Sequence, residues 1–167
     1  MYLREDTKEH FAITRATLSR LSLFHNFDEE TLAILESELK PQPIETGVEI
    51  VSEGKQDLSL YVVLSGELEV VKSLDKGNQF VRVAMLGPGG WFGEMSLLDP
   101  QPRSASVRAL APSILLPLSA QQIRTLIFDR DMRTYAALIT NIARELSRRL
   151  RVTSGILSQA ANIAHNG

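Results

Sequence analysis

The sequence of 167 residues contains no cysteine. Disulfide bonds, cysteine nucleophiles and cysteine-ligated metal sites are therefore excluded, and their absence is compatible with the cytoplasm. No apolar run reaches the roughly 18 residues that a membrane-spanning helix needs, and the charged start of the chain, Met1–His10, has no apolar signal core. We therefore expect a cytoplasmic protein that is neither secreted nor inserted in a membrane.

Neither sign of charge dominates, because the formal net charge is −2. The distribution is uneven: residues 119–167 hold seven arginines against three acids, and residues 1–40 hold eight acids against five bases. An arginine-rich helix is usually a solvated face or a partner contact, and less often a nucleic-acid surface. Composition alone therefore gives little support to nucleic-acid binding.

The apolar pattern divides the chain into three parts. Residues 1–40 have helical spacing, and a second helix is expected to start at Asp28 with the apolar stripe Leu32, Leu35 and Leu39. Residues 41–118 alternate short strand-like runs with glycines and contain a hairpin-like turn at 75–78. The expected strands are 48–52, 58–64, 68–74, 80–86, 104–110 and 113–118. Many short strands joined by tight turns predict a sandwich, barrel or jelly roll.

Residues 119–167 return to a helical pattern. Ser119 and Gln122 match a capping box, and a longer helix is expected to follow the break at 129–131 and to run to about Ala164. Its apolar residues form a near-heptad seam: Ile139, Ile142, Leu146, Leu150, Thr153, Leu157, Ala160 and Ala164. The seam packs either on its own barrel or on a second copy of itself. We favour a homodimer, because the seam is longer than a small barrel can cover.

The most informative segment is 86–105. Its glycines at 89, 90 and 93 allow close approach of the backbone to a ligand, and Met95–Leu98 is expected to form one helical turn whose amide groups face an anion. Arg103 supplies a guanidinium that matches two phosphate oxygens. Glu94 would repel phosphate, so it needs another donor, and a sugar hydroxyl is suitable. This set suits a sugar joined to a phosphate of low charge.

An alternative interpretation is that the glycines only make turns and that Glu94 and Arg103 form a surface ion pair. Each residue alone favours that alternative, but the ordered combination is more specific. A nucleoside triphosphate is less suitable, because such ligands need a lysine and a metal, and the chain has no GxxxxGK[ST] motif.

The residues GEMSLL at 93–98 and PRSA at 102–105, with Gly47, Gly54, Gly66 and Tyr61, resemble the cyclic nucleotide-binding domain family. The resemblance implies an eight-stranded jelly roll in which 92–105 is the phosphate-binding cassette. It also implies that Glu94 accepts the ribose 2′-hydroxyl and that Arg103 pairs with the cyclic phosphate. Further phosphate and wall contacts implied by the family come from Val83, Leu86, Gly93, Met95, Ser96 and Ser104.

The segment 146–154 resembles the long helix of bacterial catabolite activator proteins. That resemblance implies that Thr153 and Ser154 read the adenine of cAMP at a dimer contact. The alternative is that Thr153 belongs only to the seam and Ser154 faces solvent. The preference for cAMP over cGMP rests on these two residues, and cGMP is the alternative ligand.

Only 13 residues follow Ser154, which is too short for the DNA-binding helix-turn-helix of those activators, so no direct DNA binding is expected. The three histidines, His10, His25 and His165, are far apart in sequence, and neither a metal site nor an enzyme activity is indicated.

We therefore expect an α+β, mainly β protein with three parts: N-terminal helices (1–40), an eight-stranded antiparallel jelly-roll barrel (41–118), and C-terminal lid and dimerisation helices (119–167). The expected function is a stand-alone cAMP sensor that signals to an unknown protein. The alternatives are a nucleotide-free dimerisation module and a transcription regulator that acts with a DNA-binding partner.

Overall fold

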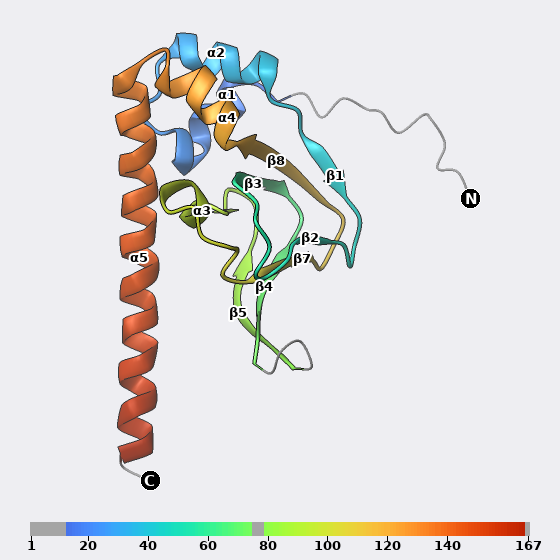
Figure 1. Cartoon of the computed structure of the whole chain (residues 1–167), viewed down its shortest axis with the longest axis vertical. Coiled ribbons are helices and arrows are strands. Elements are labelled where there is room, and N and C mark those ends of the chain that lie inside the picture. Colours follow the sequence, from blue (N-terminus) through green and yellow to red (C-terminus); the bar gives the residue numbers. More distant parts are fainter. Residues whose placement is uncertain (1–12, 75–78, 166–167) are drawn as a thin grey trace, which may run out of the picture.

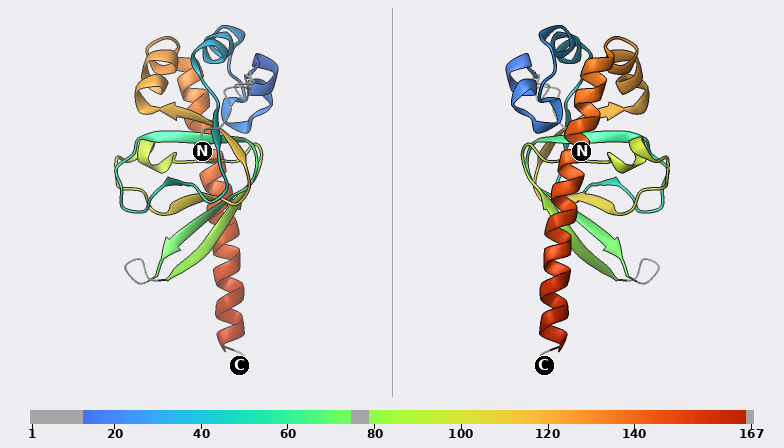
Figure 2. Two further views of the ribbon diagram at one scale, coloured as in Figure 1. Left: turned by 90° about the vertical axis from the view of Figure 1, so that its right-hand side faces the viewer. Right: turned by 90° about the vertical axis from the view of Figure 1, so that its left-hand side faces the viewer.

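The computed structural model describes residues 13–74 and 79–165, without the side chains of residues 160 and 163–165. The predicted turn at 75–78 and the side chains of Ala160 and Ala164 therefore lie outside the described residues. Figure 1 shows an antiparallel barrel with helices at one end and one long helix, α5, that runs along the barrel and past it. Figure 2 shows that the N-terminal helices and the start of α5 lie together at that end.

The N-terminal part contains α1 (Arg15–Arg20), a short 3-10 helix η2 (Ser22–Phe24) and α2 (Glu29–Glu38). The predicted start of the second helix is confirmed, because the Asp28 carboxylate accepts a hydrogen bond from the Thr31 amide and caps α2. The predicted stripe is also confirmed, since Leu32, Leu35 and Leu39 are all buried. These side chains belong to one core cluster with residues of the barrel and of α5.

Eight strands form two four-stranded antiparallel sheets, in the orders β1-β8-β3-β6 and β2-β7-β4-β5. The bounds are β1 (Gln42–Ile44), β2 (Glu49–Val51), β3 (Ser59–Ser65), β4 (Leu68–Ser73), β5 (Phe80–Leu86), β6 (Trp91–Phe92), β7 (Ser106–Ala109) and β8 (Ser113–Ser119). The predicted fold class is therefore confirmed.

Two strands, β1 and β6, do not stand out in the sequence pattern. β1 contains Pro43, which is tolerated because β1 is an edge strand that pairs only with β8. β6 has only two residues, which is too short for an alternating pattern, and it pairs with β3 at Tyr61 and Val62. β6 matters for the site, because it leads directly into the segment that resembles the cassette.

The C-terminal part starts with α4 (Ala120–Ile123), and the predicted capping box is present between Ser119 and Gln122. A five-residue π-helix, η3 (Arg124–Phe128), and a turn then lead into α5 (Met132–His165). The Asn141 side chain fixes α5 to the N-terminal helices, because its Nδ2 donates hydrogen bonds to the carbonyls of Leu23 (3.0 Å) and His25 (2.8 Å). In the described part of the chain, no helix has the length and apolar character that crossing a bilayer requires.

Candidate functional site

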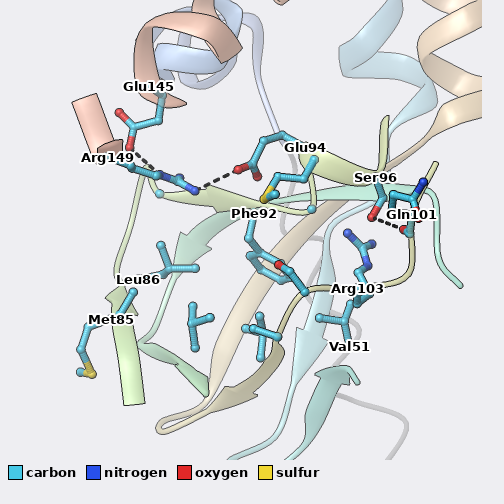
Figure 3. A pocket seen from close by; sticks show the side chains of 18 of the residues that line it. Val51, Met85, Leu86, Phe92, Glu94, Ser96, Gln101, Arg103, Glu145 and Arg149 are labelled. Atoms are coloured by element: carbon cyan, nitrogen blue, oxygen red, sulfur yellow. Dashed lines mark hydrogen bonds and ion pairs between the residues drawn. The ribbon is translucent and has the colours of Figure 1, made fainter. Parts of the chain in front are cut away.

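A cavity of about 590 Å³ lies between the segment 86–105, the sheet that contains β5, and the middle of α5 (Figure 3). One wall is apolar and comes from four strands of that sheet, with Val51, Val70, Ala84, Leu86 and Val107. The opposite side is polar. Seven of the predicted site residues line the cavity: Leu86, Gly93, Glu94, Met95, Ser96, Arg103 and Ser104.

Arg103 is buried at this cavity with only 5% of its surface exposed. Its Nη2 lies 2.7 Å from the Asp57 carboxylate and donates a hydrogen bond to the Ser59 carbonyl. Its Nε and Nη1 are also buried, but they have no hydrogen-bond partner. A buried polar group without a partner costs free energy, so these two nitrogens form an unfilled donor site at the edge of the cavity.

Asp57 holds the guanidinium in this orientation. Burial acts to raise the pKa of Asp57, but the hydrogen bonds from Arg103 and from the Ser59 amide outweigh it, and the pKa is lowered. The carboxylate therefore stays ionised near neutral pH. Because this ion pair uses only Nη2, it leaves Nε and Nη1 of the guanidinium without a hydrogen-bond partner.

Gly93 is required by the close approach of the backbone to Arg103. Its φ angle is +92°, which other residues rarely adopt, and a Cβ atom at this position would lie 2.5 Å from Arg103 Nη1 and against the Ser59 carbonyl. Any side chain here would push the guanidinium out of place. The prediction that this glycine allows close approach is therefore consistent with the geometry of the site.

Glu94 lies on the same side of the cavity and is 3% exposed. It does not pair with Arg103. Its Oε1 lies 3.2 Å from Nη1 of Arg149 on α5 (Figure 3). The alternative of a surface ion pair between Glu94 and Arg103 is therefore wrong, because both side chains are buried and each has a different partner. Burial raises the pKa of Glu94, although the nearby positive charge of Arg149 opposes this change.

Arg149 joins the cassette to the long helix through several contacts. Its Nε donates to Glu145 (2.9 Å), its Nη2 donates to the Trp91 carbonyl (2.7 Å), and its guanidinium stacks 5.0 Å from the centre of the Trp91 ring. Hydrogen bonds from Arg148 lower the pKa of Glu145 to about 2 in spite of partial burial, and the bond from Arg149 adds to this effect. Arg149 thus connects Glu94 directly to α5.

The predicted helical turn is present as α3 (Met95–Leu98). The amide groups of Met95 and Ser96 lie at its first turn, where a helix has no internal acceptor for them. Ser96 is buried, and its hydroxyl lies 3.4 Å from the Gln101 carbonyl, which it faces across the loop (Figure 3). The first turn of α3 and Arg103 therefore border the same cavity.

Three predicted site residues do not line the cavity: Val83, Thr153 and Ser154. The expectation that Val83 lines the apolar wall is not met, because its side chain is 54% exposed and neighbouring strand residues point to opposite faces. Thr153 and Ser154 are exposed on the part of α5 beyond the barrel, and the Thr153 hydroxyl donates to the Arg149 carbonyl. Within one chain these two residues lie outside the cavity.

Sequence reasoning missed Asp57, Glu145, Arg148 and Arg149. Asp57 gave no signal, because its partner Arg103 lies 46 positions later and only the fold brings them together. The two arginines lie inside the segment that resembles an activator helix, but the resemblance assigned a role only to its Thr-Ser pair. No cluster of three or more metal-ligating side chains occurs within residues 13–74 and 79–165. The described cavity thus brings together the unpartnered nitrogens of Arg103 and the buried carboxylate of Glu94.

Residues 41–130 match the family model for the cyclic nucleotide-binding domain, and the chain belongs to that family. This match covers the barrel, the cassette and η3, whereas Glu145, Arg148 and Arg149, which line the cavity from α5, lie outside it.

Among its relatives is the cyclic AMP receptor protein of Thermus thermophilus, 36% identical over 129 residues, covering 77% of this chain and 57% of that protein. A crystal structure of the Thermus thermophilus catabolite activator protein superposes with a TM-score of 0.69 at 34% identity, over 84% of this chain and 63% of that one. A co-crystal structure of the regulatory domain of Toxoplasma gondii PKA with cAMP gives a TM-score of 0.61 at 31% identity, over 69% of this chain and 43% of that one. The chain spans about three fifths of the length of its bacterial relatives.

Proposed function

We propose that this chain is a non-catalytic cytoplasmic sensor that binds cAMP in the cavity between the cassette and α5. The observation that carries the proposal is Arg103, a buried guanidinium with two unpartnered nitrogens at the edge of a cavity of about 590 Å³. A guanidinium edge suits two oxygens of one phosphate, and the cavity has the size of a small-molecule site. The relatives of the chain, which include a cyclic AMP receptor protein, support the same ligand.

The charges that surround the cavity favour a phosphate of low charge. Its charged lining residues are the acids Glu94, Asp99 and Glu145 and the arginines Arg103, Arg148 and Arg149. Three acids and three arginines sum to zero, so no excess of positive charge is available for a triphosphate. A cyclic phosphate carries one negative charge and needs only the free edge of Arg103 and a few amide groups.

In this proposal the phosphate oxygens accept hydrogen bonds from Nε and Nη1 of Arg103, from the first amides of α3 and from Ser104. The ribose 2′-hydroxyl donates to Glu94, whose Oε1 stays near Arg149. The base lies on the apolar wall that includes Ala84 and Leu86. Each assignment uses a group that borders the cavity.

Signalling follows from the contact between Glu94 and Arg149. A ribose hydroxyl at Glu94 competes for the carboxylate, so nucleotide binding shifts the balance between positions of α5 relative to the cassette. A downstream protein then responds to the position of α5. The first structural step is therefore expected at Arg149, before any change in the barrel.

The homodimer is part of the proposal. The exposed leucines at 150 and 157 continue the seam, and a second copy would cover them. In such a dimer the partner helix would bring Thr153 or Ser154 to the base, because these residues are out of reach within one chain. Hydroxyl groups both donate and accept, so the preference between cAMP and cGMP depends on this contact.

Calorimetric titration with cAMP and then cGMP tests the proposal. We expect saturable binding of both nucleotides, with cAMP tighter, and a rise in the unfolding temperature with ligand concentration. Absence of heat and of stabilisation at millimolar cAMP would refute the sensor function and would favour the nucleotide-free dimerisation module. Salt-dependent gel shifts in the presence of a DNA-binding partner would distinguish the alternative function, a regulator that acts through that partner.

A further inference from the structure

A second concave surface lies beside the nucleotide cavity, on α3. It is an apolar groove of about 300 Å³ between α3, the α4–η3 segment and the first half of α5. Leu97 and Leu98 of α3 line this groove, whereas Met95 and Ser96 of the same four-residue helix line the nucleotide cavity. Leu98 and Phe128 at the groove are 46% and 40% exposed, so apolar surface faces solvent there.

The wall of the groove includes the π-helix η3. Its hydrogen bond from the Asp129 amide to the Arg124 carbonyl spans five residues. π-Helical turns are rare and occur often at functional sites. Here the two end residues of η3, Arg124 and Phe128, both line the groove, so the unusual turn places a cation and an aromatic ring on the same concave surface.

Arg124 is the only charged residue among the ten that line the groove. Its side chain is 71% exposed, and its nearest acid is Asp129, with Nε and Oδ2 separated by 3.8 Å. An exposed ion pair at that distance contributes little free energy, so a second anion can compete for the guanidinium. The groove therefore combines an apolar floor with one available positive charge at its edge.

The size of the groove favours a small molecule over a protein. A stable protein interface uses about 20–30 residues on each side, whereas ten residues line this groove. Small-molecule sites begin at about 300 Å³. We propose that the groove binds a small hydrophobic monocarboxylate, with its apolar chain against Leu98 and Phe128 and its carboxylate at Arg124.

Octanoate is a suitable probe, and its titration needs no nucleotide. The experiment therefore tests the groove whether or not the chain binds cAMP. Calorimetry of the full chain is expected to give saturable binding with one octanoate per chain, and binding of octan-1-ol about fivefold weaker because the alcohol lacks the charge that pairs with Arg124. Failure of octanoate to bind at millimolar concentration, or equal binding of the alcohol, would overturn the proposal.

Two substitutions locate the site. Arg124→Gln should weaken octanoate about fivefold and leave octan-1-ol unchanged, and the matched substitution of another exposed arginine outside the groove, Arg130→Gln, should change neither. Phe128→Asp should abolish binding of both probes, with urea unfolding used to verify that this variant is folded. An affinity for octanoate that neither groove substitution changes would contradict the proposal. A second result would also contradict the proposal: the parent chain fails to bind octanoate, and Phe128→Asp lowers the oligomeric state of the protein. The groove would then be a contact between protein chains.

Discussion

The two halves of α5 share one apolar pattern but lie in different surroundings. Among the side chains of α5 that the structure describes, the buried ones all lie in its first half: Thr134, Leu138, Asn141 and Ile142. In the second half every described side chain from Leu150 onward is exposed, and Leu150 and Leu157 are 68% and 64% exposed. The same heptad-like seam is therefore core in one half and uncovered surface in the other.

This difference separates two roles of one helix. The first half is held by packing and by the hydrogen bonds of Asn141, and it ends at Arg149, which contacts the cassette. The second half has no partner within the described chain. A long helix thus links the cavity to an exposed apolar surface.

Ile142→Ala should destabilise the protein by about 2–4 kcal/mol, because it removes a fully buried side chain and leaves a cavity. The matched change in the second half is Leu157→Ala, which should alter the free energy of unfolding of the monomer by less than about 0.5 kcal/mol. Urea unfolding at low protein concentration measures both values. Equal losses for the two variants would remove the distinction between the two halves.

Arg149→Met should destabilise the protein by about 1–2 kcal/mol at pH 7, because it leaves the Glu94 carboxylate buried without its partner. The expected loss of stability is smaller than for a fully buried ion pair, because the Arg149 side chain is 32% exposed and solvent screens part of the interaction. Urea unfolding at pH 7 and pH 5 measures the loss.

The pH dependence gives this prediction a sign. Burial already raises the pKa of Glu94. The folded protein therefore gains stability when Glu94 is protonated at low pH, and it loses this stability as the pH rises through the folded-state pKa. Removal of Arg149 raises that pKa further, and the loss should therefore be greater at pH 7 than at pH 5. Arg148→Met is the control, because Arg148 pairs with Glu145 and not with Glu94. A loss that is the same at both pH values would contradict the role of Glu94.

Asp28→Ala should cost about 1 kcal/mol at pH 7, because Asp28 caps α2 and lies 2.6 Å from the Thr134 hydroxyl on the first half of α5. Its pKa is lowered to about 2, chiefly by the Thr134 hydrogen bond, so its contribution is present above the unfolded value of 3.8 and is lost as pH falls toward 2. The difference from the parent protein should shrink over that window in thermal unfolding. Glu29→Ala should show neither effect, and a pH-independent difference for Asp28→Ala would argue against the cap.

Replacement of both Leu150 and Leu157 by lysine should have the smallest effect on the folded monomer, since both side chains are exposed. It should nevertheless convert the proposed dimer to a monomer in sedimentation velocity. Gln159→Lys, an exposed polar residue in the same half, is the matched control and should leave the dimer intact. A parent chain that sediments as a monomer at high micromolar concentration would contradict the dimer.

Local sequence signals were sufficient for much of the fold. The cap at Asp28, the capping box at Ser119 and the alternating strand residues act over a few positions, so they are visible in the sequence. β6 was not predicted because two residues carry no period, and β1 was obscured by Pro43. The fold class also drew on the resemblance, which implied eight strands where the pattern indicated six.

The sequence likewise predicted some residues of the site and missed others. Gly93, Glu94 and Arg103 lie close together in sequence, and their chemistry suggested a phosphate ligand. Asp57 and Arg149 were missed, because their contacts depend on the packing of β3 and α5 against the cassette. The seam residues of α5 were predicted as one surface, since periodicity does not reveal where the barrel ends.

The central claim is that the free edge of Arg103 binds the phosphate of a cyclic nucleotide. Its most direct test is the calorimetric affinity for cAMP of Arg103→Gln beside that of Arg108→Gln, which removes an arginine outside the cavity. Loss of a charge-assisted contact of about 1.5–3 kcal/mol predicts an affinity about 10- to 150-fold weaker for Arg103→Gln and an unchanged affinity for Arg108→Gln. A folded Arg103→Gln variant that binds cAMP as tightly as the parent chain would contradict the account.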